Sequence, residues 1–323
     1  MKIYRKGTEL PIREYNFTLH QGGGGDLISQ LPALKYILDN HKNIIMNLWV
    51  HSYGVELCQA VFKSYSNCII GDISKYKGVY KEDLPARSPY VHNISNLAMH
   101  LTDHAFLSLV GCDVEPEHKN YIKLDPIDVS HFNLPKRYAV VATGFTSETR
   151  EWNPESVKET TDYLVSKNIV PVYIGKSYTP SFITENKNEA IKGTFKADYS
   201  NGLNLIDKTT LLEVHSIIAR TEVAIGLDNG LVPHLAGMTD VPIVAGFTTV
   251  RPEHRLPYRH GVKGWNCEVV APTKEELACA FCQSDMTFAE PTHSFTKCYY
   301  SDFKCLDAMS SNKWIEALKK VGI

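Results

Sequence analysis

The chain has 323 residues, of which 43% are hydrophobic and 22% are charged, and its formal net charge is -2. This composition is typical of a folded globular protein and excludes a disordered chain, a fibrous repeat and a coiled coil. At about 150 residues per domain, the length predicts roughly two domains. The near-neutral charge gives no general attraction to nucleic acid or to an anionic membrane, although it is compatible with a local basic patch.

The sequence favours a cytoplasmic protein without a membrane span. No apolar run reaches the ~18 residues that a spanning helix needs, and the charged N-terminal stretch lacks the apolar region of a signal peptide. Eight cysteines are too few in a chain of this length for a disulfide scaffold. We therefore expect reduced thiols.

Four cysteines near the C-terminus have a spacing that suggests zinc. Cys279 and Cys282 form a Cys-x-x-Cys pair, and Cys298 and Cys305 follow it. However, six residues separate Cys298 from Cys305, more than the roughly two to four of a usual zinc-binding pair. The first pair also lies in a helical pattern, where small buried thiols are common. We therefore expect these cysteines to pack in the protein and to bind no metal.

Strand patterns alternate with helical patterns along the chain, which predicts βα units and parallel sheets. In the first part, a run of glycines ends the first strand, and apolar residues then recur at helical spacing. The stretch 72–125 is less regular. The expected elements of this part are strands at 15–21 and 43–49 and helices at 27–38, 53–63 and 97–110.

The second part repeats the alternation more clearly. Asn153 and Pro154 open a helix with a capping residue followed by proline, and Thr210 and Glu213 have the spacing of a capping box. The segment 125–136, with its two prolines, is the best linker. The expected strands are 138–143, 169–174, 223–227 and 241–247, and the expected domains are residues 1–130 and 131–323.

Two α/β halves facing across a cleft follow from this order, and open α/β sheets bind ligands at the carboxyl ends of their strands. One such end is the glycine loop of Gly23, Gly24 and Gly25. Glycines let backbone N–H groups approach a ligand, and the following helix N-terminus favours negative charge. Asp26 begins that helix. The alternative is a capping aspartate after a flexible turn.

A second such end is the turn Asp228-Asn229-Gly230, which leads from a strand into a helix. Turns of this kind bind phosphate through N–H groups and the helix dipole. His234, one helical turn further on, would reach the same ligand. A plain β-to-α turn and a histidine that only packs are the alternatives.

Two polar segments complete the candidates. Hydroxyl groups and Arg150 follow the strand at 138–143, where they suit a phosphate ligand, with a solvated loop as the alternative. A basic run contains Arg251, Arg255 and Arg259 and continues to Lys263. Prolines within it predict a loop rather than a continuous helix. Such a loop suits a diphosphate, an acidic acceptor or a nucleic-acid backbone, or is simply solvated.

Several of these segments, in this order, resemble one family. Residues 25–34 resemble its Gly-Asp…Leu-Pro-Ala-Leu pattern, residues 150–155 its basic-x-Trp-x-Pro segment, and residues 226–236 its Gly-x-Asp-[Ser/Thr]-Gly…His-Leu-Ala signature. Cys298 and Cys305, before a final helix, are similar to its C-terminal cysteine pattern. The family is glycosyltransferase family nine, the heptosyltransferase-like enzymes. The resemblance implies a GT-B fold, with two Rossmann-like α/β domains facing across a cleft and a C-terminal helix that closes the structure.

The resemblance also implies an inverting transfer of a sugar from a nucleotide-diphosphate donor to an acceptor hydroxyl, with Asp26 as the general base. No Asp-x-Asp motif occurs, so the sequence predicts metal-independent chemistry with the nucleotide sugar as co-substrate and no other cofactor. The candidate donor contacts are Thr146, Arg150, Lys176, Asp228, Asn229, Gly230 and His234, and the candidate diphosphate or acceptor contacts are Arg251, Arg255 and Arg259.

The acceptor stays open at this point. A saccharide or a lipid-linked saccharide is the leading expectation. A phage-type DNA glycosyltransferase, which adds a sugar to a hydroxymethylated base, keeps the chemistry and changes the partner. A nucleotide-sugar epimerase and a non-catalytic nucleotide-sugar-binding protein are the further alternatives.

Overall fold

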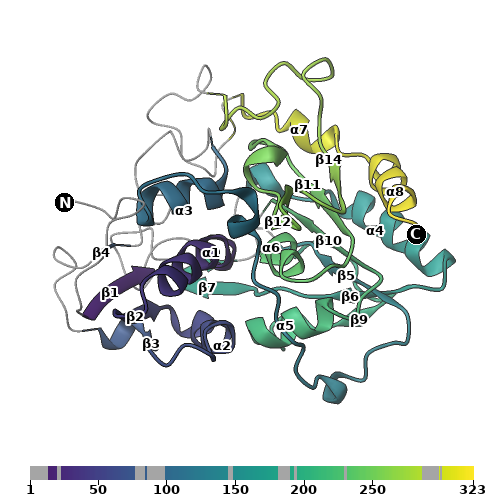
Figure 1. Cartoon of the computed structure of the whole chain (residues 1–323). Coiled ribbons are helices and arrows are strands. Elements are labelled where there is room, and N and C mark those ends of the chain that lie inside the picture. Colours follow the sequence, from purple (N-terminus) through teal and green to yellow (C-terminus); the bar gives the residue numbers. More distant parts are fainter. Residues whose placement is uncertain are drawn as a thin grey trace.

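The computed structural model describes residues 14–19, 23–76, 84–85, 99–144, 148–180, 190–192, 195–228, 231–285, 298 and 300–323. Two parallel sheets lie side by side in it, each with helices packed around it (Figure 1). The predicted α/β architecture with parallel sheets is therefore confirmed. Within the described part of the chain, no helix is both long and apolar enough to cross a membrane.

The first sheet has the strand order β3-β2-β1-β4, and all its pairings are parallel. In β1 and β2 the side chains are mostly buried, because α1 and its neighbours cover the sheet. Its elements are β1 (Glu14–Leu19), α1 (Gly24–Asn40), β2 (Ile45–Val50), α2 (Ser52–Val61), β3 (Cys68–Asp72), η1 (Ile73–Lys75), β4 (Leu84–Pro85) and α3 (Leu101–Leu109).

The second sheet has the order β14-β11-β10-β5-β6-β9 and is also parallel throughout. Its strands β5, β10 and β11 are buried at every residue, as the central strands of a doubly covered sheet are. Its elements are β5 (Tyr138–Ala142), η5 (Glu148–Arg150), α4 (Pro154–Ser166), β6 (Val170–Tyr173), β9 (Leu203–Asn204), α5 (Leu211–Ile218), β10 (Val223–Leu227), α6 (Leu231–Gly237), β11 (Ile243–Gly246), η6 (Pro252–His254) and β14 (Cys267–Val270).

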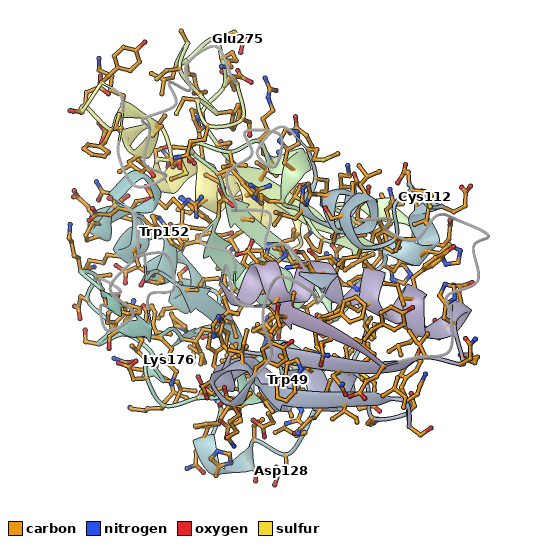
Figure 2. All side chains as sticks on the ribbon, turned by 90° about the vertical axis from the view of Figure 1, so that its left-hand side faces the viewer. Trp49, Cys112, Asp128, Trp152, Lys176 and Glu275 are labelled. Carbon is orange, nitrogen blue, oxygen red and sulfur yellow. The ribbon has the colours of Figure 1, made fainter. Side chains whose placement is uncertain are left out.

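Two small antiparallel hairpins and a C-terminal helical segment complete the fold. The hairpins pair β7 (Tyr178–Pro180) with β8 (Ala190–Lys192), and β12 (Tyr258–Arg259) with β13 (Val262–Lys263). At the C-terminus, α7 (Lys304–Asp307) precedes α8 (Ser311–Lys320). Figure 2 labels Trp152, which stacks on Trp314 of α8 with ring centroids 3.9 Å apart. The stack fixes the closing helix to the second sheet.

Local sequence explains most helix starts. The Asn153 side chain accepts hydrogen bonds from the N–H groups of Glu155 and Ser156, and Pro154 occupies the first helical position of α4. Thr210 and Glu213 form the predicted capping box of α5. One expectation was wrong: the segment after Thr273, which contains Cys279 and Cys282, forms successive turns and no helix.

The segment between the sheets carries only short 3₁₀ turns, η3 (Pro116–Lys119) and η4 (Ser130–Phe132). Every described strand of the first sheet precedes it, and every described strand of the second sheet follows it. The Tyr121 N–H donates to the Tyr258 carbonyl, and the Ile127 N–H donates to the Ser216 hydroxyl. These bonds hold the segment against the second sheet's elements.

Candidate active site

The two halves meet where α1 begins. Helix α1 packs against α3 on its own side and against α6 of the second half. A Cβ atom at Gly24 would come within 2.8 Å of the Leu231 Cδ1 atom, so a larger residue there would require the Leu231 side chain to move. The glycine loop therefore permits a close approach between the start of α1 and the start of α6.

Asp26 lies in the first turn of α1, at this junction. Its Oδ2 accepts a hydrogen bond of 2.7 Å from the Gly23 N–H, so the carboxylate also caps its own helix. The residue is only 7% exposed. Both alternatives considered for it thus apply together: Asp26 caps the helix and faces the junction of the two halves.

Burial raises the pKa of Asp26 from 3.8 to about 6. The Gly23 N–H, Arg255 and Arg150 act in the opposite direction, and the nearby charge of Asp228 adds to the rise. A carboxylate with a pKa near 6 is deprotonated at neutral pH and basic enough to accept a proton in a transition state. Asp26 is therefore suited to general base catalysis.

Asp228 directly follows β10 and lies opposite Arg150, which ends η5. The Arg150 Nε atom lies 3.9 Å from the Asp228 Oδ2 atom, farther than a hydrogen bond, and both side chains are largely buried. Burial raises the pKa of Asp228, while Arg150 and Arg255 lower it. The two residues that the sequence placed at the donor end are thus neighbours.

Arg255 comes from the loop after β11 and is 4% exposed. Its Nη1 donates to the neighbouring His254 carbonyl at 2.9 Å, and its Nε has no hydrogen-bond partner among the described residues. Its charge lowers the pKa of both Asp26 and Asp228. One guanidinium therefore acts on two buried carboxylates, one from each half.

The first half holds this loop in place through His100, at the N-cap of α3. Nδ1 of His100 accepts from the Thr102 N–H at 3.1 Å, so Nε2 carries the proton and donates to the Leu256 carbonyl at 2.7 Å. Burial lowers the pKa of His100 to about 3, which keeps the ring neutral. The residue after Arg255 is thereby tied to α3.

His234 of α6 also lies near Arg255 and His100. Its Nδ1 lies 2.7 Å from the Tyr121 hydroxyl, and the two rings stack. Burial, then Arg255 and His100, lower the pKa of His234 to about 3. His234 is therefore neutral at physiological pH. No sequence motif marks Tyr121 or His100, and only the folded chain shows that they support the site.

Of the remaining donor candidates, Lys176 alone lies within the part of the chain that the structure describes. Thr146, Asn229 and Gly230 lie outside the described residues. Lys176 is exposed, beyond the end of β6, and its charge acts on Asp207 (Figure 2 labels Lys176). The described donor-side group therefore consists of Arg150, Asp228 and His234.

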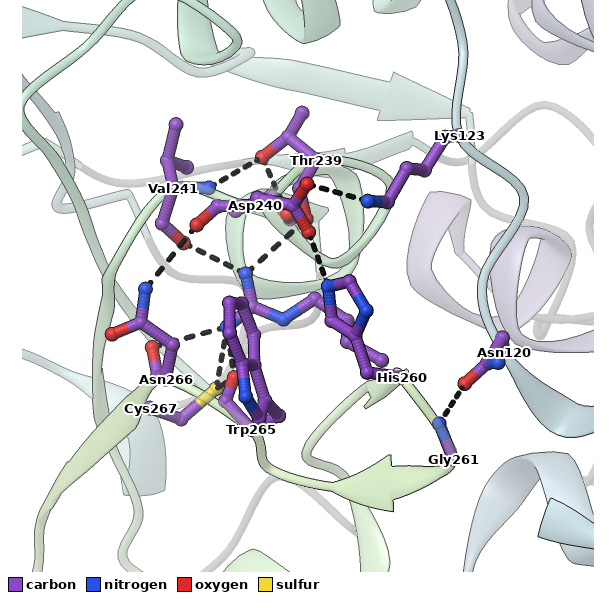
Figure 3. A network of polar contacts seen from close by, with 12 residues as sticks. Asn120, Lys123, Thr239, Asp240, Val241, His260, Gly261, Trp265, Asn266 and Cys267 are labelled. Atoms are coloured by element: carbon purple, nitrogen blue, oxygen red, sulfur yellow. Dashed lines mark hydrogen bonds and ion pairs between the residues drawn. The ribbon is translucent and has the colours of Figure 1, made fainter. Parts of the chain in front are cut away.

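The arginines of the basic run have different partners and do not form one binding surface. Arg251 binds Asp285 through Nε and Nη2 and pairs with Glu253. Arg259 is 2% exposed, and its guanidinium donates to backbone carbonyls of Thr239, Val241, Trp265 and Asn266 (Figure 3). The expectation that Arg259 contacts a ligand was wrong, because the protein's own carbonyls engage its donors.

The four C-terminal cysteines line one pocket, together with Thr149, Thr248 and Thr249. Burial raises the pKa of the Cys305 thiol to about 12, and the other three cysteines add to the rise. All four are half-buried rather than fully packed in the core. As the described side chains stand, no group of three or more His, Cys, Asp and Glu residues has the arrangement of a metal site.

Two parallel α/β sheets, joined by a linker and meeting at a buried carboxylate flanked by cations, have the two-domain arrangement of the GT-B fold. A family model described as glycosyltransferase family 9 (heptosyltransferase) matches residues 81–280. The chain belongs to this family. Because this is a family of glycosyltransferases, the epimerase and the non-catalytic binding protein are no longer alternatives for this chain. No match was found among curated proteins.

Solved structures of the same class share the fold. The iron-containing dodecameric glycosyltransferase TibC from enterotoxigenic E. coli H10407 aligns with a TM-score of 0.70 at 15% identity, over 99% of this chain and 77% of TibC. A family 9 glycosyltransferase from Veillonella parvula aligns with a TM-score of 0.63 at 14% identity, over 97% and 98% of the two chains. The E. coli ADP-heptose LPS heptosyltransferase II aligns with a TM-score of 0.59 at 10% identity, over 95% and 98%.

Proposed function

We propose that this glycosyltransferase transfers a sugar with inversion from a nucleotide-diphosphate donor to an acceptor hydroxyl, and that Asp26 is its general base. The burial of Asp26 beside Arg150, Arg255 and Asp228 supports this proposal most directly. A base must be deprotonated before the reaction and protonated after it, and a pKa near 6 suits both.

The proposed step is a single displacement. The acceptor oxygen attacks the anomeric carbon while its proton moves to the Asp26 carboxylate, and the bond from the anomeric carbon to the diphosphate oxygen breaks. The leaving diphosphate gains one negative charge. Arg150 and Arg255 are the described cations that would stabilise that charge. Thr146, Lys176, Asn229 and Gly230 stay proposed donor contacts on the strength of the family resemblance.

ADP-heptose is the first donor to test. A second TibC structure was determined in complex with ADP-D-β-D-heptose, and heptosyltransferase II is named for ADP-heptose. A saccharide or lipid-linked saccharide is the proposed acceptor. The DNA alternative depended on an accessible basic loop, and Arg255 and Arg259 of that loop are buried. They are not available to a DNA backbone.

Because TibC is an iron-containing enzyme, we also considered whether this chain could bind a metal. Four cysteine thiols lining one pocket are a donor set that iron and zinc accept, although the side chains are not arranged as a metal site as they stand. We propose Cys279, Cys282, Cys298 and Cys305 as the residues that would hold an iron ion. Bound there, the metal would cross-link the turns before residue 285 to α7. The transfer chemistry proposed above needs no metal.

The proposed function is tested by incubating the protein with a panel of nucleotide sugars, ADP-heptose among them, and with saccharide and hydroxymethylated-DNA acceptors. Mass spectrometry of the acceptors should detect a glycosylated saccharide. The product's anomeric configuration, determined by NMR, should be opposite to the donor's. A glycosylated base would instead favour the DNA alternative, and retention of configuration would contradict the single displacement. Asp26→Asn serves as the control, since it removes the base and keeps the shape.

A further inference from the structure

The hairpin segment 256–263, which contains β12 and β13, contacts both halves of the molecule. Successive side chains of a β-strand point to opposite faces, and those of Tyr258 and Arg259 in β12 do so. The Tyr258 hydroxyl donates to Oδ1 of Asp103 in α3 at 2.9 Å. The Arg259 guanidinium instead donates to carbonyls that precede β11 and β14, among them that of Val241 at 2.7 Å. One short strand therefore binds the first half with one face and the second half with the other.

Asp103 is the centre of the contacts on the first-half side. Its Oδ1 also accepts a hydrogen bond of 2.8 Å from Nζ of Lys119, and its Oδ2 lies 3.4 Å from Nζ of Lys263 in β13. The Lys119 side chain is buried and pairs with Asp113 as well. Charge-assisted hydrogen bonds are stronger than neutral ones, and partly buried ion pairs are screened less by salt than exposed pairs. Asp103 thus binds both strands of the hairpin, one through each carboxylate oxygen.

The backbone of the hairpin segment is bound from the same side. Nε2 of His100 donates to the Leu256 carbonyl at 2.7 Å, and the His100 ring contacts the Tyr258 ring edge-on at a centroid distance of 4.8 Å. The Gly261 N–H donates to Oδ1 of Asn120 at 2.7 Å (Figure 3). His100 caps α3 and Asn120 directly follows η3, and α1 packs against both elements. These bonds therefore attach the hairpin segment to the elements that surround α1.

The contacts with the second half are more deeply buried than those with the first. The Arg259 side chain is buried, and four backbone carbonyls accept from its guanidinium. On the first-half side, the side chains of Asp103 and Lys263 are 20% and 33% exposed. A partly exposed ion pair costs less to separate than a buried guanidinium that would lose its partners. A movement that separates the halves here therefore breaks the contacts with Asp103 and leaves the hairpin segment on the second half.

We infer that the hairpin segment is a bridge that holds the two halves at the separation needed for transfer, and that Asp103 is the positioning residue on its first-half side. The effect on transfer rests on the proposed function, in which the base Asp26 belongs to the first half and the donor contacts Arg150 and Asp228 belong to the second. A misplacement of reacting groups by about 1 Å costs roughly 10²-fold in rate. Asp103 acts through the hairpin segment and not on the substrate.

Hydrogen exchange tests the bridge without turnover. Asp103→Asn removes the charge and keeps the shape, so the fragment 256–264, which includes the Gly261 N–H, should exchange roughly tenfold faster. Exchange in β10 should stay as in the wild type. In the same variant kcat should fall roughly tenfold, while the dissociation constant of ADP, measured by calorimetry, changes by less than about twofold. Asp162→Asn is the matched control, because its carboxylate also binds a lysine and a neutral polar side chain, but within the second half.

Unchanged exchange of the fragment 256–264 would overturn the bridge, whatever the activity. Exchange that rises equally in β10 would show that Asp103 supports only the overall fold, and faster exchange at an unchanged kcat would overturn its positioning role. A wild type that transfers no sugar would overturn the proposed function, while the exchange rates still decide whether the bridge exists. Tyr258→Phe removes one donor to Asp103 and keeps the ring, so it gives the same test, with a smaller rise, if Asp103→Asn fails to fold.

Discussion

The Tyr121 hydroxyl lies 2.7 Å from Nδ1 of His234 and joins the segment between the two sheets to helix α6. The site is therefore supported by a residue that belongs to neither sheet. Tyr121 also binds the Tyr258 carbonyl through its backbone, three residues beyond Arg255. One tyrosine thus positions both the neutral histidine of α6 and the loop that carries the buried arginine.

Asp26→Asn should lower transfer by roughly 10²-fold or more while leaving donor binding largely intact. In the wild type, activity should fall as the pH decreases through about 6, since burial raises the pKa of Asp26 to that value and protonation removes the base. Initial rates between pH 5 and 8 measure this limb. Near-normal turnover by Asp26→Asn would remove Asp26 from the role of base.

The same substitution should stabilise the fold at neutral pH. The pKa of Asp26 is raised from 3.8 to about 6, so this group favours the folded state below pH 3.8 and that contribution is lost as the pH rises through about 6. Removing the charge should recover up to about 3 kcal/mol of unfolding free energy at neutral pH. Urea unfolding at pH 7.5 measures it. Asp128→Asn, at an exposed carboxyl, should give no such gain, and an unstabilised Asp26→Asn would contradict the burial argument.

Arg150→Ala should weaken the binding of ADP by roughly 10-fold to 100-fold, because a charge-assisted contact to phosphate is lost. Calorimetry with ADP measures the effect. The matched control is Arg137→Ala, whose guanidinium is half exposed and pairs with Glu222 on the surface. Equal dissociation constants for the wild type and Arg150→Ala would place Arg150 outside the donor site.

Tyr121→Phe should destabilise the fold by about 1–3 kcal/mol, since it leaves a buried nitrogen of His234 without its partner. Chemical denaturation measures this cost. Tyr163→Phe is the comparison, because the Tyr163 hydroxyl binds only the terminal Ile323 carbonyl and should cost less. A larger loss in Tyr163→Phe would show that the Tyr121–His234 contact is not a significant support.

Stability should also fall on acidification. The pKa values of His100 and His234 are lowered from 6.5 to about 3, so the unfolded chain binds these protons and the folded state does not. Each histidine should cost about 1.4 kcal/mol per pH unit below 6.5, with Asp26 acting in the opposite direction below about 6. Unfolding curves from pH 8 to pH 5 follow the loss. His100→Asn should flatten the slope by about one histidine's share, and an unchanged slope would contradict the assignment.

Transfer should survive EDTA, because the proposed chemistry uses arginines in place of a metal on the diphosphate. Activity assays with and without EDTA measure this, and strict dependence on added Mg²⁺ or Mn²⁺ would refute the metal-free chemistry.

Elemental analysis of the purified protein tests the cysteine pocket separately. It should find iron that is lost in a Cys279→Ser, Cys282→Ser double variant. Cys58→Ser, at a buried cysteine outside the pocket, is the control. Purified protein that contains neither iron nor zinc would refute the proposed metal site.

The sequence predicted those features that local physics determines. Helix starts at Asn153 and Thr210 follow from the capping groups, and strands β1, β2, β5, β6, β10 and β11 follow from short β-branched and aromatic runs. The place of Asp26 at a strand's carboxyl end was predicted because this carboxylate directly follows a glycine turn and begins the next helix, whereas its proposed role as general base came from the family resemblance. These signals are contained within a few neighbouring residues.

The rest depends on contacts between distant segments. Arg255 and Arg259 look alike in the sequence. Only the folded chain shows that Arg255 donates to the carbonyl of the preceding residue, whereas Arg259 donates to carbonyls of four other residues. Tyr121 supports His234 across a separation of 113 residues, which no local pattern reveals. The turns around Cys279 were mistaken for a helix because their apolar spacing is helical. The N–H groups of Phe281 and Gln283 instead donate to the carbonyls of Thr248 and Thr249.

The stack of Trp152 on Trp314 has a spectroscopic consequence. The chain has four tryptophans, and these two are buried within a ring-centroid distance of 3.9 Å, with Trp152 only two residues after Arg150. The proposed contact of Arg150 with a nucleotide should therefore change the emission of the indole pair, which depends on the stacking geometry. Replacing Trp49 and Trp265 by phenylalanine would leave this pair as the main source of the signal.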